Sequence, residues 1–475
     1  MSILEVLILA LVALIIGSIS HPKIRSHLLL AASIIIVYWL QSRTTTIYNI
    51  TFWLPTFTII IVTISWALTV PPEIRTLRDN WTGILTTIVT IFAINITRYF
   101  GEINLFFPNI AIPRPIVVFP ALAIISLALV IALRIPTLNQ AALPVLLLLI
   151  LLLFIVVKTP LLNSYIYTTI SEYTGSPPKN NGFFVWLGFS YFGFRMIHTI
   201  RDRQNGQLPP VTFTEYMNYT IFFPSFAAGP IDRVERFTVD SAKTNPWASL
   251  DWLDAGSRFF VGLFKKFVIA DTLAAFALNS DTAVHVSSSG WFWILLYAYA
   301  FQIYFDFSGY TDIAIGLAKI MGINLPENFN SPYLKPNLTL FWNSWHMTLT
   351  QWFRSYFFNP LQRGLRSPRI RIASWLLILI LQVATMVLIG LWHGVVLNFV
   401  IWGAWHGIGL FIHNRWREYM GSRFSAWAIS PLRKNILVGG GVFLTFHYVA
   451  LGWVFFVLPA NQIPTAIKML LEFGA

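Results

Sequence analysis

The chain has 475 residues, of which 56% are hydrophobic and 11% charged, and its mean hydropathy is +0.67. An average soluble domain has about 25% charged residues, so this composition excludes a soluble globular fold. The formal net charge of +13 could suggest a nucleic-acid-binding protein. The cations stand in short connectors, however, which is typical of the cytoplasmic loops of a membrane protein that face anionic lipid. The absence of cysteine excludes disulfides, thiolate metal sites and a cysteine nucleophile.

Apolar runs long enough to cross a hydrocarbon core of about 30 Å recur along the chain. Examples begin at Ile3, Pro55, Ile116, Leu143 and Ala373. We therefore expect an all-α polytopic protein, multi-pass in the bacterial inner or plasma membrane, with roughly 11 to 13 transmembrane helices and additional interfacial helices.

The first run is expected to be an uncleaved anchor. No Lys or Arg precedes it, whereas Lys23 and Arg25 follow directly. By the positive-inside rule, these two cations predict a cytoplasmic face after the first span and an external N-terminus.

The residue composition changes along the chain and divides it into three parts. Residues 1–155 are generic aliphatic spans, 156–460 form the expected functional core, and 461–475 are a C-terminal tail. Beyond about residue 180, the spans are rich in aromatic, glycine and polar residues. Polar groups are costly inside a bilayer and usually functional, so the chemistry is expected in this second zone.

One segment departs from simple spanning. Between Ser331 and Leu365, polar and cationic residues alternate with Trp and Phe too evenly for a lipid-facing helix. We interpret it as helices that lie at the interface or line a cavity, entered and left through Pro336 and Pro360.

The nine histidines are the main candidates for chemistry, because no G-x-S-x-G, H-E-x-x-H, P-loop or His-x4-Asp acyltransferase motif is present. Four lie in connectors or at an expected interface: His21, His27, His198 and His285. Five fall in the aromatic second zone: His346, His393, His406, His413 and His447.

The stretch from Ile372 to Asn414 has no Asp, Glu, Lys or Arg, and as helix it is long enough for two crossings, with a turn expected near 394–398. This places His393 at the end of a span or in a bend. Thirteen residues later, His406 would face about 220° away on a continuous helix, so the two are not expected to share one role.

Small residues repeat beside both histidines. Gly390 with Gly394, and Gly403 with Gly407, are small-x-x-x-small pairs that let helix backbones approach closely in lipid. We expect His406 to be a structural imidazole hydrogen-bonded across helices, and His447 to be structural as well.

An imidazole removed from water is mostly neutral and can accept a proton from a hydroxyl. That is the general base needed to transfer an acyl group from a thioester to an alcohol. Asp306 and Asp312 stand six apart within a span, which favours gating or orienting groups over a paired acid and base. No metal site is expected, since no i, i+4 histidine pair or adjacent carboxylate accompanies His346, His393 or His406.

These residues belong to blocks that resemble, in order, the signature blocks of the membrane-bound O-acyltransferases. The blocks are "FPSFAAGPIDRVERF" (223–237), "QIYFDFSGYTDIAIGLAKIMGINLPENFNSPY" (302–333), "FWNSWHMTLTQWFRSYFFNPL" (341–361), "GLWHG" (390–394) and "TFHYVALGWVFF" (445–456). The resemblance covers about residues 155–460. Its closest branch is the bacterial alginate O-acetyltransferase membrane subunit, and the teichoic-acid D-alanylation membrane protein is a more distant relative.

The resemblance implies a helical bundle with a central funnel, through which a thioester donor reaches the histidines from the cytoplasm and a hydroxyl acceptor from outside. It implies His393 as the general base and His346 as an orienting or auxiliary group. It also implies five weaker cavity candidates: Asp306, Ser308, Asn330, Trp345 and Arg354.

The function that the resemblance implies is O-acetylation of an exported or cell-envelope polysaccharide, directly or through a periplasmic or extracellular partner that receives the acyl group. The donor would be acetyl-coenzyme A or an acyl-carrier protein, used as a substrate rather than a bound cofactor. Membrane lipid is the other expected partner, and no nucleic acid is expected.

Two features depart from the family pattern. Asn343 and Ser344 stand where the family often has basic residues, and Val457 stands where an arginine is usual. The donor or acceptor of this protein is therefore expected to differ from that of relatives with those cations.

Two other functions remain open from the sequence. A transporter or lipid flippase would use the buried histidines as a proton relay and consume no acyl group. A polytopic glycosyltransferase would need clustered carboxylates at the membrane edge, and Glu73, Asp79 and Glu102 show no such clustering.

Overall fold

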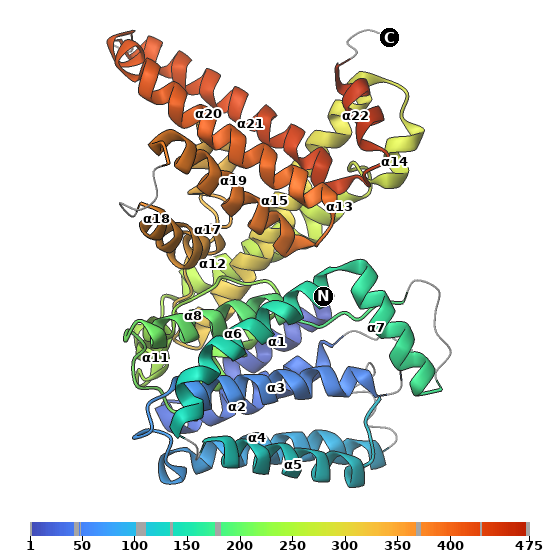
Figure 1. Cartoon of the computed structure of the whole chain (residues 1–475), viewed down its shortest axis with the longest axis vertical. Coiled ribbons are helices and arrows are strands. Elements are labelled where there is room, and N and C mark those ends of the chain that lie inside the picture. The colour runs from blue at the N-terminus through green and yellow to red at the C-terminus, as the bar shows by residue number, and fades with distance from the viewer. Residues whose placement is uncertain are drawn as a thin grey trace. The chain divides into compact units, whose positions relative to one another are not determined.

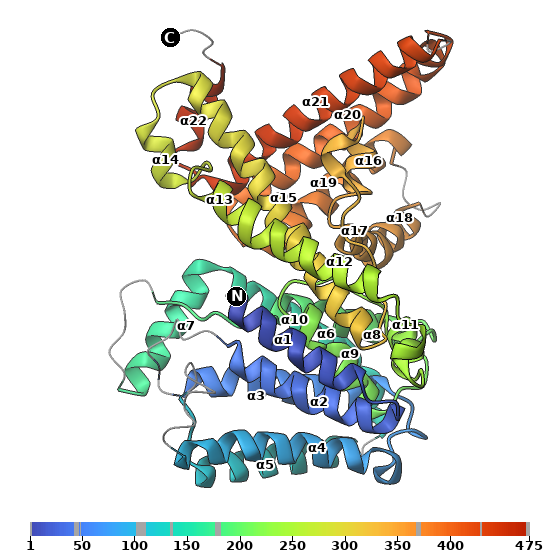
Figure 2. The ribbon, with the colours of Figure 1, turned by 180° about the vertical axis from the view of Figure 1, so that it is seen from behind.

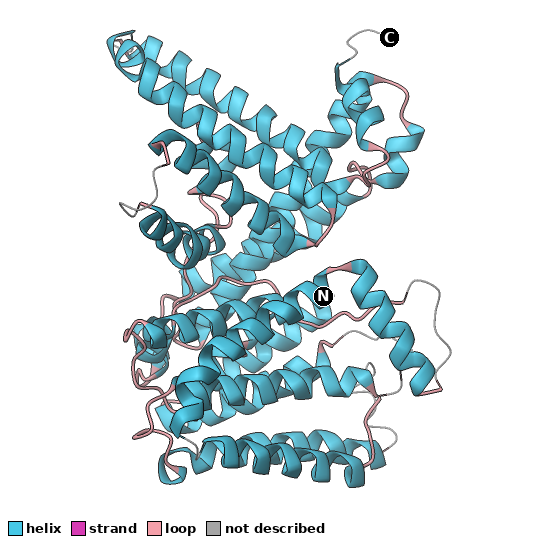
Figure 3. Ribbon diagram, viewed as in Figure 1, coloured by secondary structure: helices cyan, strands magenta, loops and turns pink. Residues whose placement is uncertain are grey.

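The computed structural model describes residues 2–41, 47, 49–100, 111–133, 136–175, 182–366, 372–427 and 430–471. Throughout these ranges the secondary structure is helical, with no strand (Figure 3). The chain forms two compact units, 1–259 with 314–325 and 260–313 with 326–475, which we name unit 1 and unit 2. The all-α fold class is confirmed, whereas the central funnel and the domain boundaries at 155 and 460 stay predictions.

Unit 1 is built from the helices that carry the first apolar runs. Its long helices pack lengthwise, with α4 beside α5 and α2 beside α3 in both views (Figures 1 and 2). The helices are α1 (Ile3–Gly17), α2 (Pro22–Trp39), α3 (Ile50–Thr69), α4 (Leu77–Ile96), η1 (Thr97–Tyr99), α5 (Pro115–Leu133), α6 (Pro136–Lys158), α7 (Pro160–Tyr173), α8 (Phe189–Gln204), α9 (Phe213–Thr220), α10 (Phe223–Phe226), α11 (Val234–Ser241) and η3 (Pro246–Ser249).

Buried polar side chains fix the connections of unit 1. Arg25 is only 3% exposed, and its guanidinium donates to the carbonyls of Ile19 and Ser241. Arg195, 1% exposed, donates to the carbonyls of Thr220 and Ser225. Each guanidinium thereby satisfies backbone carbonyls at or near the ends of helices.

Unit 2 holds the aromatic second zone. Its long helices α19, α20 and α21 run side by side (Figures 1 and 2). The unit boundaries fall within α12 (Trp252–Leu263) and α15 (Ser289–Ile320). The other helices are η4 (Phe264–Ala270), α13 (Asp271–Ala274), α14 (Ser280–His285), η5 (Pro332–Leu334), α16 (Leu338–Trp342), α17 (Met347–Phe353), η6 (Arg354–Phe358), α18 (Asn359–Leu365), α19 (Ser374–His393), α20 (Leu397–Trp427), α21 (Pro431–Val457) and α22 (Ile463–Leu471).

Fewer helices than expected are each long and apolar enough to span a membrane. Within the described ranges there are four: Ile50–Thr69, Leu77–Tyr99, Ser374–His393 and Pro431–Val457. A fifth span results if Ala142–Lys158 and Pro160–Tyr173, bent by 88°, are counted together. Length and composition of the described helices thus give four or five candidate spans, and the expected total of 11 to 13 stays a prediction.

The segment 331–365 is helical and non-spanning, as expected, but Pro360 is not its exit. The chain remains helical from α17 through η6 into α18. The helix η6, directly before Pro360, is a π-helix. Its wider turn leaves room for the proline ring, and the helix continues although proline has no N–H to donate.

The predicted turn between two helices is confirmed. α19 ends at His393 and α20 begins at Leu397, inside the expected interval near 394–398. This hairpin carries both Trp-His-Gly triplets and forms the frame of the candidate site.

Candidate active site

His346 occupies an unusual backbone position at the start of α17. Its φ is 43°, in the left-handed region that a residue with a side chain adopts at a cost of about 1–3 kcal/mol. Thr350 donates its backbone N–H to the His346 carbonyl at 3.1 Å. Such local strain clusters at functional sites, and here it turns the imidazole into the interior of unit 2, where it is only 3% exposed.

Asn328 orients the His346 ring. The Asn328 side-chain oxygen lies 3.2 Å from His346 Nδ1 and also accepts from the Thr348 backbone N–H and hydroxyl, at 3.2 Å and 2.9 Å. Because this oxygen accepts, Nδ1 carries the proton and Nε2 of a neutral ring is the acceptor nitrogen. Burial lowers the pKa of His346 to about 3, so the ring is neutral at pH 7.

His393 is the last residue of α19 and is half-buried. Its imidazole lies among aromatic rings, with centroid distances of 4.5 Å to Trp392 and 4.8 Å to Phe456. The rings of Phe399 and Trp402 follow at 5.8 Å and 5.7 Å. The ring therefore stands at a helix end with apolar walls and partial access.

Trp392 connects the two histidines. Its indole lies 5.9 Å from the His346 ring and 4.5 Å from the His393 ring. The His346 ring also packs edge-on against Phe307, with 4.6 Å between the ring centroids. The structure thus brings together the predicted base and the predicted auxiliary group through one side chain that the sequence did not single out.

The predicted glycine pairs do bring α19 and α20 together. A Cβ added to Gly390 would lie 2.1 Å from the Phe399 carbonyl oxygen, and one added to Gly403 would lie 2.5 Å from the Met386 carbonyl oxygen. A Cβ on Gly407 would lie 2.6 Å from the Val383 Cα. The hairpin is therefore closed by backbone contact, as small-x-x-x-small pairs allow.

His406 is structural, but not by a hydrogen bond. It is fully buried, and among the described residues neither ring nitrogen has a hydrogen-bond partner. It packs against Trp402 and Trp342 at 5.0 Å and 5.1 Å. The expected hydrogen bond across helices is wrong, because glycine and tryptophan neighbours fill the space that a polar partner would need.

His447 is structural in the expected way. Its Nε2 lies 2.8 Å from the Tyr297 hydroxyl and its Nδ1 lies 2.7 Å from the Phe443 carbonyl oxygen. Both ring nitrogens are used inside unit 2, which leaves neither for a substrate.

The weaker candidates divide between core and surface. Trp345 is 5% exposed and stacks on Phe341 at 5.7 Å, whereas Asn330 is exposed and donates its backbone N–H to the Ser344 carbonyl. Ser308 is buried. Trp345 and Ser308 are therefore interior groups, and Asn330 is a loop residue.

Asp306 and Asp312 are held by neighbouring lysines. Asp306 lies 2.5 Å from Lys266, and Asp312 lies 2.6 Å from Lys265. Lys265 and Lys266 belong to the π-helix η4, whose wider turn presents both amines toward α15. Each carboxylate is thus ion-paired with its own lysine, and the gating or orienting role expected from the sequence stays a prediction.

A pocket of about 380 Å³ in unit 2 runs along the hairpin. Its lining on α19 is Ile378, Gln382, Thr385, Met386 and Ile389, and its polar residues include Asn343, Arg354, Asn414, Arg415, Arg417 and Glu418. Arg354 is exposed and donates to Asn343 at 2.9 Å. The pocket therefore has a cationic end near the start of α19 and an apolar end near Ile389 and Trp342.

The helical repeat of the α19 lining leads to His393. Apart from the adjacent pair Thr385 and Met386, these residues recur at steps of three or four. A further step of four after Ile389 reaches His393, one turn or about 6 Å along the same face. Sequence reasoning missed this pocket, although the i, i+4 spacing from Ile378 to His393 was readable.

Sequence reasoning also missed Asn328, Trp392 and Phe456 as site residues. Asn328 stands two positions before Asn330 in the same motif, and only the fold shows which asparagine faces His346. Trp392 precedes His393 directly, and this adjacency was the available signal.

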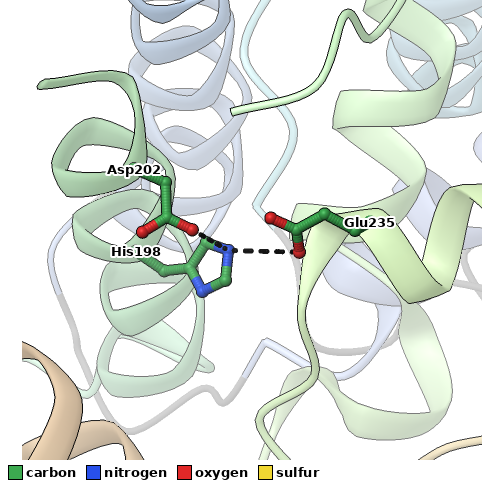
Figure 4. A group of neighbouring side chains, drawn as sticks. All are labelled: His198, Asp202 and Glu235. Carbon is green, nitrogen blue, oxygen red and sulfur yellow. Dashed lines mark ion pairs between the residues drawn. The ribbon is translucent and has the colours of Figure 1, made fainter. Parts of the chain in front are cut away.

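One further group of titratable side chains comes together in unit 1. Among the described residues, His198 and Asp202 of α8 and Glu235 of α11 have ligand atoms within 4.8 Å of one another (Figure 4). His198 Nε2 lies 3.3 Å from Asp202 and 3.9 Å from Glu235. This spacing would suit a divalent cation, but burial and the nearby Arg233 cation lower the pKa of His198 to about 3. The same positive charge opposes a metal ion, so we interpret the cluster as a link between α8 and α11.

Comparisons with known proteins match a long region of the chain that contains the candidate site. The sequence profile of the MBOAT, membrane-bound O-acyltransferase family, matches residues 142–456, which include His346, His393 and the hairpin. A teichoic acid D-alanyltransferase of Bacillus subtilis is 30% identical over 303 residues, 62% of this chain and 74% of that protein.

Two relatives with other names match about the same region. A probable alginate O-acetylase of Pseudomonas aeruginosa is 35% identical over 275 residues, 57% of this chain and 48% of that protein. A peptidoglycan O-acetyltransferase of Helicobacter pylori is 35% identical over 267 residues, 54% of this chain and 46% of that protein. The chain thus spans about half the length of these two relatives.

Proposed function

The chain belongs to the membrane-bound O-acyltransferase family, and on that premise we propose that it acetylates hydroxyls of an exported or cell-envelope polysaccharide with a cytoplasmic thioester as donor. It is thus an enzyme, a multi-pass membrane O-acyltransferase. The names of its relatives describe acyl transfer to alginate, peptidoglycan and teichoic acid, which supports a polymer as the final acceptor, reached directly or through a partner protein.

In this proposal His393 is the general base. Its imidazole takes the proton of the acceptor hydroxyl while the oxygen attacks the thioester carbonyl carbon. The C–O bond forms, the C–S bond breaks, and the thiolate takes the proton from the imidazolium, so that an ester and a free thiol leave. No enzyme nucleophile is needed, in keeping with a chain without cysteine.

His346 is the auxiliary group in this scheme. Its Nε2, which accepts when Nδ1 donates to Asn328, can bind and orient the acceptor hydroxyl. The observation that carries the proposal is the pair of contacts by which Trp392 joins the two imidazoles. General base catalysis requires a base positioned within reach of the hydroxyl whose proton it takes.

The pocket along α19 supplies the route for the donor. Arg354, Arg415 and Arg417 at its cationic end suit the phosphate groups that coenzyme A and the arm of a carrier protein share. A flexible thioester arm that follows the lining past Ile389 would deliver its carbonyl carbon to His393, one turn further on.

The test is acyl transfer in liposomes. We would reconstitute the full chain and supply radiolabelled acetyl-coenzyme A, or acetylated carrier protein, on one side and candidate polysaccharides on the other. We expect His393→Ala to lower the rate at least 100-fold, within the range of general base catalysis, and His346→Ala to lower it about 10-fold. His285→Ala, at an exposed helix end, is the control and should retain the wild-type rate.

Two outcomes would overturn the proposal. Full transfer by His393→Ala would remove the assigned base. Failure of every acyl donor, together with export of a substrate by the wild-type protein, would replace acyl transfer by the transporter function.

A further inference from the structure

An apolar groove crosses unit 1 outside the candidate active site. It has a volume of about 620 Å³, within the range of about 300–1,000 Å³ typical of ligand pockets. It lies between α3, α4 and α5, and its lining is Thr56, Ile59, Ile60, Thr63, Trp66, Ala67, Pro72, Arg75, Thr76, Leu77, Asn80, Ile84, Thr87, Ile88, Ile91, Leu122, Ile125, Ser126, Val130 and Phe213.

The groove lies between two candidate membrane spans and is longer than the hydrocarbon part of one lipid leaflet. Both α3 and α4 are long and apolar enough to span a membrane. The lining of α4 extends from Leu77 to Ile91, which at 1.5 Å per residue is about 21 Å. One leaflet contributes about half of a hydrocarbon core of about 30 Å, or about 15 Å. The groove therefore has room along its length for a single acyl chain and for a headgroup beyond the end of that chain.

Four polar side chains in the wall are already hydrogen-bonded within unit 1. The hydroxyls of Thr56, Thr63 and Thr87 donate to carbonyls of their own helices. Asn80 donates to the Ile74 and Thr76 carbonyls and accepts from the Phe213 backbone N–H. The wall thus offers methyl groups and aliphatic side chains, which favour a hydrocarbon chain over water.

Arg75 gives the groove a cationic end. Its Nη1 donates to the Ala67 carbonyl at 2.7 Å, while its Nε is buried and, among the described residues, has no hydrogen-bond partner. The charge of Arg203 adds to that of Arg75, and the charge of Glu73 opposes it. Arg75 as a whole is only partly buried and lines the groove, so its guanidinium can bind a headgroup phosphate there.

We propose that this groove binds one acyl chain of an anionic membrane phospholipid, with the headgroup phosphate bound by Arg75. The N-terminus of α4 is capped by Thr76 and carries the Asp79 carboxylate, so the positive charge that favours an anion here comes from Arg75 and Arg203. The lipid would fill the space between α3, α4 and α5 and hold these helices together. This inference is independent of the proposed function, because lipid binding can be measured without acyl transfer.

The test is lipid retention by the full chain purified in detergent. Phosphatidylglycerol, phosphatidylcholine and inorganic phosphate are added separately, and retained lipid is counted by native mass spectrometry while thermal stability is recorded. We expect phosphatidylglycerol to be retained several-fold more than phosphatidylcholine and to raise the melting temperature. Inorganic phosphate alone should have no effect, since the acyl chain supplies the apolar contacts.

Matched variants separate the headgroup from the chain. Arg75→Gln should lower phosphatidylglycerol retention about fivefold, as expected from loss of one cation near an anionic lipid. Arg78 is exposed on the first turn of α4, so the control Arg78→Gln should leave retention unchanged. Ile84→Trp should fill the groove and lower retention of both lipids. Leu85→Trp, the same change at the next, exposed position, should leave retention unchanged.

A photoactivatable phosphatidylglycerol keeps the test valid should Ile84→Trp fail to fold. Its crosslinks in the wild-type protein are expected in α3 and α4. Equal retention of the two lipids, unchanged retention in Arg75→Gln, crosslinks outside this groove, or an equal effect of inorganic phosphate would each overturn the proposal.

Discussion

His346 and His393 contact the same indole, that of Trp392, from the start of α17 and the end of α19. Because Trp392 and His393 are neighbours on one helix, the position of α19 determines both the base and the wall against which His346 rests. The relation between the two imidazoles therefore depends on how α17 and α19 are held within unit 2, and the following predictions test what holds them.

Replacing Asn328 should loosen His346. In Asn328→Ala, the N–H and hydroxyl of Thr348 and Nδ1 of His346 lose their common acceptor. We expect a loss of about 1–3 kcal/mol in the free energy of unfolding and an acyl-transfer rate about tenfold lower. Asn330→Ala, at the exposed asparagine of the same motif, is the control; equal losses in both variants would contradict the role of Asn328.

A methyl group at Gly403 should separate the hairpin. In Gly403→Ala the new Cβ would stand 2.5 Å from the backbone of Met386 and Val387, so α19 and α20 must shift at a cost of about 1–3 kcal/mol. We expect a lower melting temperature and a rate reduced about 10- to 100-fold, since small displacements of catalytic groups are costly.

Gly439→Ala provides the matched control. A Cβ at this position in α21 meets nothing within 4 Å, and alanine is the better helix former by about 1 kcal/mol. We expect unchanged transfer and equal or higher stability, measured by thermal unfolding in detergent. Unchanged stability in Gly403→Ala would show that backbone contact does not hold the hairpin.

The cationic end of the pocket should control donor affinity. Arg417→Gln removes one charge from the pocket lining, and we expect a KM for acetyl-coenzyme A about tenfold higher with kcat nearly unchanged, the signature of lost uniform binding. Arg423→Gln is the control, because Arg423 lies on the same helix against Tyr419, outside the pocket lining. Initial rates at varied donor concentration decide between a KM effect and a kcat effect.

Acid should destabilise the protein partly through His346. Burial lowers its pKa to about 3, whereas in the unfolded chain a histidine pKa is about 6.5. The unfolded state then binds the proton first, so this contribution is fully present above pH 6.5 and is lost as the pH falls from 6.5 toward 3. We expect the melting temperature of His346→Gln to fall less steeply over this range, and equal slopes would show that His346 makes no such contribution.

The local features of the site could be predicted from the sequence. The uncharged stretch predicted the turn before Leu397. The pairs Gly390 with Gly394 and Gly403 with Gly407 predicted close helix packing. Both predictions depend on residues near one another in the chain. The all-α membrane fold followed from composition alone. The assignment of a structural role to His447 also agrees with its two hydrogen bonds.

The remaining features depend on contacts between distant segments. Only the fold brings Asn328 to His346 and Trp392 between the two histidines. The total number of spans stays a prediction, because length and composition of the described helices give only the four or five strongest candidates. The expected exit at Pro360 was wrong because the helix continues past the proline through a π-helical turn. The sequence signal for a π-helical turn is much weaker than the signal by which proline predicts a helix end.

The closed hairpin limits how such a sequence can vary. At Gly390 even one added carbon would lie 2.1 Å from the Phe399 carbonyl oxygen, so no amino acid other than glycine fits without moving the helix that ends at His393. The aromatic rings around His393, in contrast, touch it by side chains that another ring can replace. Substitutions that retune acceptor or acyl preference are therefore expected to accumulate in the rings, while the glycines stay invariant during divergence of the family.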